Sequence, residues 1–148
     1  MAVNLDDQNL PVYTIGVAAK LVETSVHSLR LYETVGLLSP KRTETQRRLY
    51  SQNDINRLKC IRNFIEVEGL NLAGIKTALS LVPCWQIKDC SNEDREKCDA
   101  YYKIGEPCWI VKNRGDLCTE VDCRDCEVYL SVGRCSSIKE LIKSATTK

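Results

Sequence analysis

The stretch CTEVDCRDC, residues 118 to 126, places three cysteines within nine residues. Cys118, Cys123 and Cys126 have the spacing C-x4-C-x2-C, which is used to hold iron–sulfur clusters together with a fourth cysteine from farther along the chain. A short loop keeps several thiolates within reach of one inorganic core, and a distant ligand closes the cage. The stretch therefore predicts a cysteine-bound inorganic centre, with an iron–sulfur cluster as the first choice.

The chain contains more cysteines than one such centre needs. Cys108 is the best candidate for the fourth ligand, and the others would complete this site or form a second one. The candidate metal ligands are Cys84, Cys90, Cys98, Cys108, Cys118, Cys123 and Cys126. Cys135 follows this group. Cys60 lies on the flank of a predicted helix, where a free cysteine behaves as a small buried hydrophobe.

Zinc is the main alternative occupant. Structural zinc sites accept four cysteines but usually draw on two C-x2-C-type pairs, and only Cys123 and Cys126 form such a pair. The single histidine, His27, stands far from the cysteines in the sequence. A thiol–disulfide switch is a third chemistry open to these residues, whereas a disulfide framework is disfavoured where thiols stay reduced.

A Pro-Cys-Trp unit occurs twice, at residues 83 to 85 and 107 to 109. The repeat suggests two equivalent turns that each present a cysteine. Trp85 and Trp109 would shield sulfur from water, and solvent exposure is one lever on the potential of a cluster. The other interpretation is that both tryptophans form the core of a small appendage. The Cys-Trp pairs also resemble, loosely, a cysteine-rich module of bacterial signalling proteins, and this likeness assigns no ligands.

Two helices are predicted near the cysteines. Ser91 and Asp94 form a capping box for a short helix that continues through Cys98 to Tyr102. The segment SSIKELIKSA predicts an amphipathic helix near the end of the chain. Its apolar stripe is expected to pack in the core and is formed by Ile138, Leu141 and Ile142.

Length and composition limit the class of protein. The 148 residues, 43% hydrophobic and 28% charged, are typical of one globular domain or a small domain with an appendage. No apolar run approaches the ~20 residues that span a bilayer. The first residues, MAVNLDDQNL, lack the basic and apolar regions of a secretory signal. These features predict a cytoplasmic protein that does not associate with membranes.

The charge divides the chain into two parts. From Tyr13 to Ser80 there are ten Lys or Arg against six Asp or Glu, whereas Cys84 to Glu127 has seven against eleven. The net charges of these parts are therefore +4 and −4. We expect a basic domain over residues 13–82, a cysteine-rich sensor module over 83–135, and a short helix and tail over 136–148.

The basic part reads as a mainly helical domain with a wing. Thr14 caps one predicted helix, and Ser25 or Thr24 caps a second that ends at Gly36. Two helices joined by a short turn are the outline of a helix-turn-helix. The polar, Pro-containing stretch LLSPKRTETQRRLY predicts a β-hairpin. Ser51 with Asp54 and then Asn71 cap two further helices. The predicted inward residues are Val26, Leu29, Leu31, Tyr32, Ile55, Leu58, Ile61, Ile65, Leu72, Ile75, Leu79 and Val82.

Four ordered motifs resemble the winged helix-turn-helix domain of the MerR family of bacterial regulators: YTIGVAAKL, SLRLYETVGLLSPKRT, RRLYSQNDINRL and EGLNLAGIK. The short sequences LRLYE and NLAGIK are similar to the heat-shock-repressor branch of that family. The resemblance runs from Tyr13 to about Val82. One departure is Glu23, which stands where the family usually has glycine in the turn, at a cost of roughly 1 kcal/mol for a left-handed conformation.

The same part contains the residue types that bind DNA. A recognition helix reads base edges with side chains near its N-terminus, and phosphates are met by basic side chains. The resemblance implies phosphate roles for Arg30, Arg48 and Tyr50. The full set of candidate DNA-binding residues is Tyr13, Thr14, Ser25, His27, Ser28, Arg30, Lys41, Arg42, Arg47, Arg48 and Tyr50.

The sequence thus predicts a transcription regulator, not an enzyme, whose cysteine module senses redox state, iron–sulfur status or a metal ion. Expected partners are a pseudo-palindromic double-stranded operator, a second copy of the chain, and RNA polymerase. Operator symmetry mirrors a two-fold protein dimer, although this chain lacks the long heptad segment through which the family pairs. The alternatives are a small iron–sulfur electron-transfer protein and a zinc-stabilised DNA-binding protein without sensing. A metal-storage protein would leave the basic part unexplained.

Overall fold

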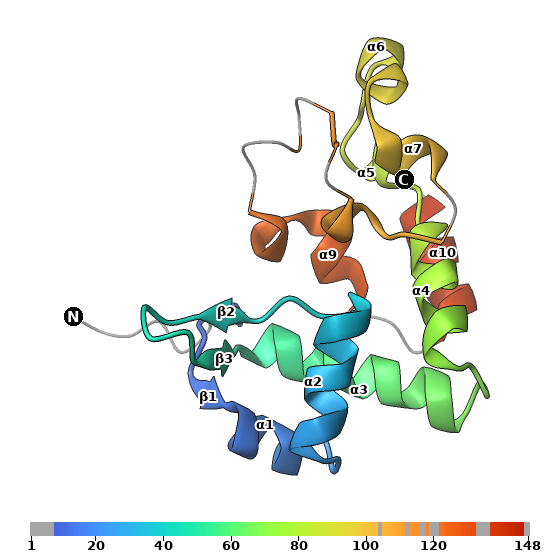
Figure 1. Ribbon diagram of the computed structural model, residues 1–148. Coiled ribbons are helices and arrows are strands. Elements are labelled where there is room, and N and C mark those ends of the chain that lie inside the picture. The colour runs from blue at the N-terminus through green and yellow to red at the C-terminus, as the bar shows by residue number, and fades with distance from the viewer. Residues whose placement is uncertain are drawn as a thin grey trace.

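The computed structural model describes residues 8–103, 105–111, 113–115, 118, 122–132 and 137–146. The chain is mainly helical, as expected, with one small sheet (Figure 1). Its elements are β1 (Tyr13–Thr14), α1 (Ile15–Leu21), α2 (Val26–Val35), β2 (Lys41–Arg42), β3 (Arg48–Tyr50), α3 (Gln52–Glu66), α4 (Leu72–Ser80), α5 (Cys84–Ile87), α6 (Asn92–Glu96), α7 (Asp99–Tyr102), the 3-10 turns η1 (Cys108–Ile110) and η2 (Cys123–Asp125), α9 (Glu127–Ser131) and α10 (Ile138–Thr146).

The predicted caps of the first helices are confirmed. Thr14 begins α1, Ser25 begins α2 and Asn71 begins α4, each with a side-chain oxygen that accepts a backbone N–H of the first turn. Ser51 and Asp54 form the predicted capping box of α3. These caps satisfy backbone donors that have no partner inside a helix, so local sequence alone fixes where each helix begins.

The turn between α1 and α2 keeps its shape without glycine. Glu23 has a φ of 56°, which is the left-handed conformation that the missing glycine would adopt. Its N–H donates to the carbonyl of Lys20, and the N–H of Thr24 donates to the carbonyl of Ala19. The helix-turn-helix is therefore retained at some cost in backbone strain.

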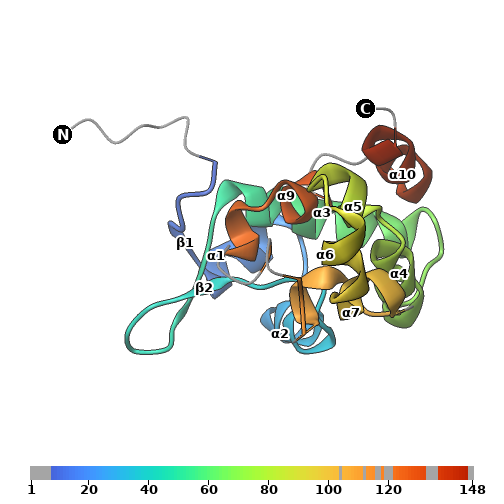
Figure 2. The same cartoon turned by 90° about the horizontal axis from the view of Figure 1, so that it is seen from above.

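The predicted wing is a β-hairpin in a three-stranded antiparallel sheet of order β1-β3-β2. Arg42 pairs with Arg48 across the hairpin, and Tyr13 pairs with Tyr50. The loop between β2 and β3 projects from the body of the molecule in both views (Figures 1 and 2). The sheet thus joins the wing to the segment that leads into α1.

The core follows most of the predicted pattern. Leu29, Tyr32, Ile55, Leu58, Ile61, Ile75, Leu79 and Val82 are buried, and Val26, Ile65 and Leu72 are partly buried against them. The prediction was wrong for Leu31, which is 41% exposed. Leu29 and Tyr32 are three positions apart and share the buried face of α2, and Leu31 lies about 100° around the helix from Tyr32. Phe64 was not predicted to be in the core, yet it is fully buried.

The cysteine-rich part consists of short helices and turns. The capping box of Ser91 and Asp94 is confirmed, but the helix that it begins ends at Glu96. Cys98 is instead the N-cap residue of the separate helix α7. The prediction of one continuous helix through Cys98 to Tyr102 was therefore wrong. At the break between the two helices, Cys98 has an extended backbone conformation.

The two parts of the chain share one core. Val128 of α9, Val132 directly after that helix, and Leu141 of α10 belong to the same buried cluster as the winged helix. Figures 1 and 2 show α9 lying over α3, while α5 to α7 continue beyond α4. The predicted packing of Leu141 in the core is confirmed. The boundaries proposed at residues 82 and 135 stay predictions, and residues 133–136 lie outside the described residues.

The close approach of η1 to the end of α2 depends on Gly36. This residue ends α2 with a φ of 95°, and Trp109 Nε1 donates to its carbonyl at 2.6 Å. A Cβ at this position would lie 2.9 Å from Ile110 Cγ2.

None of the described helices is long and apolar enough to cross a membrane.

Gly36→Ala should therefore lower the free energy of unfolding by about 1–3 kcal/mol, because it combines a left-handed alanine with overpacking against Ile110. Urea denaturation measures the change. Gly16→Ala is the matched control: Gly16 lies within α1, and a Cβ there meets no atom within 4 Å, so helix propensity should leave stability equal or slightly higher. Equal losses in both variants would contradict the contact.

Candidate functional site: a basic groove beside a cysteine centre

A groove lies between α2 and the wing, and arginines line it. Arg30 comes from α2, while Arg47 and Arg48 come from the wing. Thr14 and Gln46 contribute polar atoms to the same groove. Guanidinium groups are suited to phosphate because they present several donors in a fixed fork. The sequence therefore predicted three basic residues that the fold does bring together on one surface.

The N-terminus of α2 presents the predicted base-reading residues. His27 is exposed and Ser28 is half-buried. Ser25 is exposed but serves as the N-cap, with its hydroxyl bonded to the N–H and the hydroxyl of Ser28, each at 3.0 Å. His27 is thus the most available of the three side chains, while both serine hydroxyls are already used to begin the helix.

The charges of the wing are held by one carboxylate. Glu33 of α2 forms ion pairs with Arg42, at 2.6 Å, and with Arg48. Arg42 is exposed, and the Arg48 side chain keeps 26% of its surface exposed. Lys41 and Arg47 are exposed, and neither forms an ion pair with another of the described residues. A phosphate would therefore meet free charge at Lys41 and Arg47, and would compete with Glu33 for Arg42 and Arg48.

Tyr50 requires a correction. This residue was expected to contact phosphate, but it is fully buried, and burial raises the pKa of its phenol to about 12. Its hydroxyl lies in the interior because β3 runs into the capping box of α3, so the side chain supports the wing from below. Tyr13 donates to the side chain of Gln52 at 3.2 Å, and Thr14 is occupied as the cap of α1; both support the base of the groove.

The seven candidate ligand cysteines lie around two adjoining hollows. One hollow is lined by Cys84, Cys108, Cys118, Cys123 and Cys126. The other is lined by Cys84, Cys90, Cys98, Cys108 and Cys118. Three cysteines are common to both, so the sulfur atoms form one continuous region. Each hollow encloses about 20 Å³, which is roughly the room needed by a single water-sized atom.

The two Pro-Cys-Trp turns meet at their cysteines. The Cys108 thiol donates a hydrogen bond to the sulfur of Cys84, which lowers the pKa of Cys84 and raises the pKa of Cys108. Burial raises the pKa of Cys118 to about 11, against the opposing effect of Lys88, and it also raises the pKa of Cys90. The raised pKa values mean that Cys90, Cys108 and Cys118 hold their protons more tightly than a free cysteine does, whereas Cys84 releases its proton more readily. A metal ion would have to replace the proton of each thiol that binds it.

Cationic side chains lie among the sulfur atoms. Lys88 and Arg114 line both hollows, and Arg95 lines the second. Arg114 donates from Nη1 to the sulfur of Cys123. The Nε atoms of Arg95 and Arg114 are buried and have no hydrogen-bond partner within the part of the chain that the structure describes. The region therefore offers positive charge and spare N–H donors to an anionic, acceptor-rich group.

The tryptophans take different roles. Trp109 lines the first hollow and Trp85 the second. Trp109 also bonds to Gly36, and Trp85 packs edge-on against Tyr101 at 5.3 Å. Each ring therefore borders a hollow lined by cysteines and also makes a contact of the fold, and the shielding of sulfur from water stays a prediction.

Cys60 lies apart from this region, and the candidate ligands within it are not arranged as a complete metal site. Cys60 is 7% exposed within the core, so its predicted structural role is confirmed, and Cys135 lies outside the described residues. Among the described residues, no three Cys, His, Asp or Glu side chains are gathered to hold one ion. The sulfur atoms are therefore neighbours around shared space, not a preformed tetrahedron.

Two arginines that sequence analysis missed connect this region to the winged helix. Arg57 of α3 is 2% exposed and donates to the carbonyls of Leu37, at 2.7 Å, and Tyr129, at 2.6 Å. Arg124 is 8% exposed and pairs with Asp54 at 3.0 Å. The only sequence signal was a charged residue on an apolar helix face and another inside the CRDC motif.

Comparison with known proteins places the first part of the chain. The family described as MerR HTH family regulatory protein matches residues 13–81. The HTH-type transcriptional regulator GlnR of Bacillus cereus is 40% identical over 74 residues, which are 50% of this chain and 57% of the relative. The putative heat shock protein HspR of Streptomyces coelicolor is 43% identical over 74 residues, 50% of this chain and 49% of the relative.

A third relative is named for metals. The heavy metal-dependent transcription regulator 2 of Rhizobium meliloti is 35% identical over 81 residues, 54% of this chain and 52% of the relative. The chain thus spans about half the length of the curated relatives it matches. The resemblance drawn from the sequence motifs is confirmed for the groove-bearing part, and the cysteine-rich part has to be understood from its own contacts.

Arg48→Ala should weaken binding to every double-stranded DNA sequence alike and lower the slope of log K against log salt by about one, because it removes one phosphate-facing charge. Fluorescence anisotropy with two unrelated duplexes over a range of salt concentrations measures both. Lys97→Ala is the matched control, since Lys97 pairs with Glu93 on α6, outside the groove. An unchanged slope in Arg48→Ala, or an equal change in the control, would contradict the assignment.

Proposed function

Residues 13–81 are a helix-turn-helix domain of the MerR family, and from this premise we propose that the chain is a transcription regulator whose cysteine-rich part controls its binding to DNA. The single observation that supports control by the cysteine-rich part is the packing of the seven-cysteine region against the end of α2 and against α3. A centre placed there acts on the elements that present the groove.

The DNA-binding half is supported by the arginine groove and the exposed His27. The wing supplies phosphate contacts, which set the position of the protein on the duplex, and the N-terminus of α2 supplies contacts to base edges. The protein binds a pseudo-palindromic operator as a homodimer, and RNA polymerase is the further partner. Leu141 of α10 is buried in the core of its own chain, so this side chain is not available for a dimer contact.

The cysteine half is a thiolate-bound inorganic centre. The donor set fits such a group, because it combines seven sulfur atoms with three cations and two buried Nε–H donors. Cys108, Cys118, Cys123 and Cys126 would hold an iron–sulfur cluster, with Cys84, Cys90 and Cys98 as a second or completing set. Such a cluster supplies one-electron chemistry, and hydrogen bonds to its sulfur atoms set its potential.

Zinc is the second candidate, favoured by a specific observation. Each hollow has room for about one water-sized atom, which is closer to the size of one ion than of a cluster, and the cysteine side chains would rotate inward to gather around that ion. Four thiolates satisfy zinc, and the chain would then be a metal-stabilised DNA-binding protein without a redox signal. A small electron-transfer protein is disfavoured, since it leaves the arginine groove without a purpose.

Protein purified without oxygen should be brown, absorb in the visible range and contain iron with acid-labile sulfide. Air or a chelator should then shift its affinity for a DNA duplex, selected from a random pool with the wild-type protein, by roughly 5- to 150-fold, which is the usual range of coupling between two sites. Metal analysis and anisotropy measure the two results.

Cys108→Ser and Cys60→Ala form a matched pair for this experiment. The first removes a sulfur shared by both hollows and should lose the metal, whereas the second changes a core cysteine and should keep it. Colourless protein with stoichiometric zinc, whose DNA affinity is the same before and after oxidation, would replace the sensor by a structural zinc site.

A further inference from the structure

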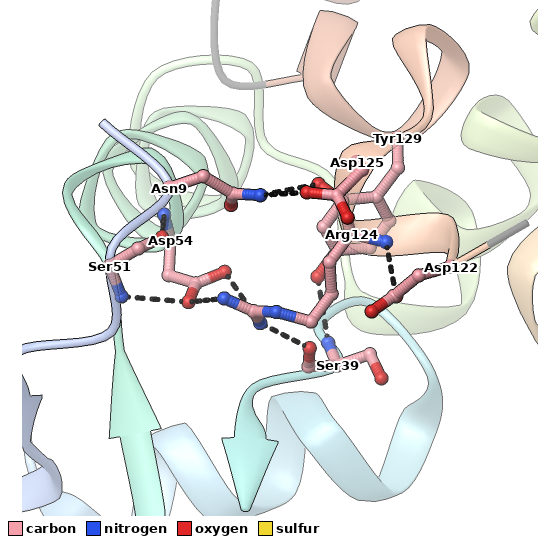
Figure 3. A network of polar contacts seen from close by, with 8 residues as sticks. All are labelled: Asn9, Ser39, Ser51, Asp54, Asp122, Arg124, Asp125 and Tyr129. Atoms are coloured by element: carbon pink, nitrogen blue, oxygen red, sulfur yellow. Dashed lines mark hydrogen bonds and ion pairs between the residues drawn. The ribbon is translucent and has the colours of Figure 1, made fainter. Parts of the chain in front are cut away.

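We propose that Arg124 is a positioning residue that ties the cysteine centre to both ends of the wing. The inference rests on the proposed function, because it names the link through which the cysteine region acts on DNA binding. Arg124 lies in η2 between Cys123 and Cys126, which both line the first hollow. Its guanidinium reaches into the winged helix, as Figure 3 shows.

Arg124 holds the end of the wing that precedes β2. Its Nη1 donates to the carbonyl of Ser39 at 2.6 Å. The N–H of Ser39 donates to the hydroxyl of Tyr129 in α9 at 2.8 Å. Both backbone groups of Ser39 are thus bonded to the cysteine-rich part, two residues before the first strand of the wing.

Arg124 also holds the end of the wing that follows β3. Its Nη2 pairs with Asp54 Oδ2 at 3.0 Å, and its Nη1 lies 3.4 Å from Asp54 Oδ1. Asp54 accepts the N–H of Ser51 at 2.9 Å, and Ser51 directly follows β3. One guanidinium therefore bridges the two points between which the whole hairpin is suspended.

The bridge lies in a buried part of the molecule, where its charges have little contact with solvent. Asp54 is 2% exposed and Ser51 is not exposed. Separating a buried ion pair leaves an uncompensated charge, so η2 moves only together with the ends of the wing. The backbone of η2 is itself held by Asp122, which accepts the N–H of Arg124, and by Asn9, which donates to the carbonyl of Arg124.

The consequence is a direct route from sulfur to DNA. Cys123 and Cys126 fix η2 from the side of the hollow, and Arg124 passes that position to Ser39 and Asp54. A change in how the two sulfur atoms are held therefore re-aims β2 and β3, which carry Arg42 and Arg48. Within the described part of the chain, Arg124 bonds to no residue of α1 or α2, so its effect falls first on the wing and reaches α2 only through the ion pairs of Glu33 with Arg42 and Arg48.

A double-mutant cycle on the full chain tests the link. Wild type, Cys123→Ser, Arg124→Met and the double variant are prepared without oxygen and compared on the DNA duplex selected with wild type. Cys123→Ser should shift affinity 5- to 150-fold and speed hydrogen exchange in residues 41–50. In the Arg124→Met background the same change should shift affinity less than about twofold. Exchange in residues 15–35 should change less than exchange in residues 41–50 in every variant.

Three further variants separate positioning from plain stability. Cys126→Ser perturbs η2 from the other side of Arg124 and should repeat the result if Cys123→Ser folds poorly. Arg124→Lys should restore part of the coupling, because it keeps a positive charge opposite Asp54. The restoration should be incomplete, because an ammonium cannot span both Ser39 and Asp54 with a planar fork. Ile75→Val weakens the core in α4, outside the network, and should leave the full response to Cys123→Ser.

Two results overturn the inference in distinguishable ways. If Cys123→Ser shifts affinity equally in the wild-type and Arg124→Met backgrounds, Arg124 is not the link, while control of DNA binding by the cysteine region stands. If neither cysteine variant alters affinity or wing exchange in the wild-type background, the proposed control itself fails, and the inference fails with it.

Discussion

The arrangement of this chain depends on one buried guanidinium, that of Arg57. Charge is costly to bury unless it is hydrogen-bonded, and here two backbone carbonyls, of Leu37 and Tyr129, accept from it. The rings of Trp109 and Tyr129 lie 4.5 Å and 3.7 Å from its central carbon, where the negative faces of aromatic rings stabilise a cation. Because these rings follow Cys108 and Cys126 closely in sequence, their docking also decides where the sulfur atoms stand.

The cysteine-rich part needs this docking because it has little core of its own. Its helices α5, α6 and α7 have four or five residues, and isolated helices of that length are not stable in water. Its best-buried apolar residues, such as Val128 and Val132, join the cluster of the winged helix. A bound inorganic centre would supply the remaining folding free energy, since metal binding to thiolates is also folding free energy.

Local features of the fold were predictable and the long-range ones were not. Thr14, Ser25 and Gly36 act within one helical turn, so their roles can be read from neighbouring residues. The ion pair of Asp54 and Arg124 joins positions that are 70 residues apart, and no local pattern encodes it. Tyr50 shows the same limit, because the resemblance correctly suggested the wing but not that the phenol lies beneath it. The sequence named the seven cysteines and left one site or two open, whereas the sharing of three of them between two adjoining hollows required the fold.

In the proposed function, DNA and the cysteine region both act on the wing. Glu33 of α2 holds Arg42 and Arg48 on its strands, and Asp54 of α3 holds its ends through Arg124. In the proposed function, a phosphate that draws Arg48 away from Glu33 would change the balance between these two carboxylates, so DNA would act on the same hairpin to which the cysteine region is bonded. Coupling of this kind is reciprocal. Whatever factor the cysteine centre imposes on DNA affinity, bound DNA must impose on the affinity of the sulfur region for its own occupant.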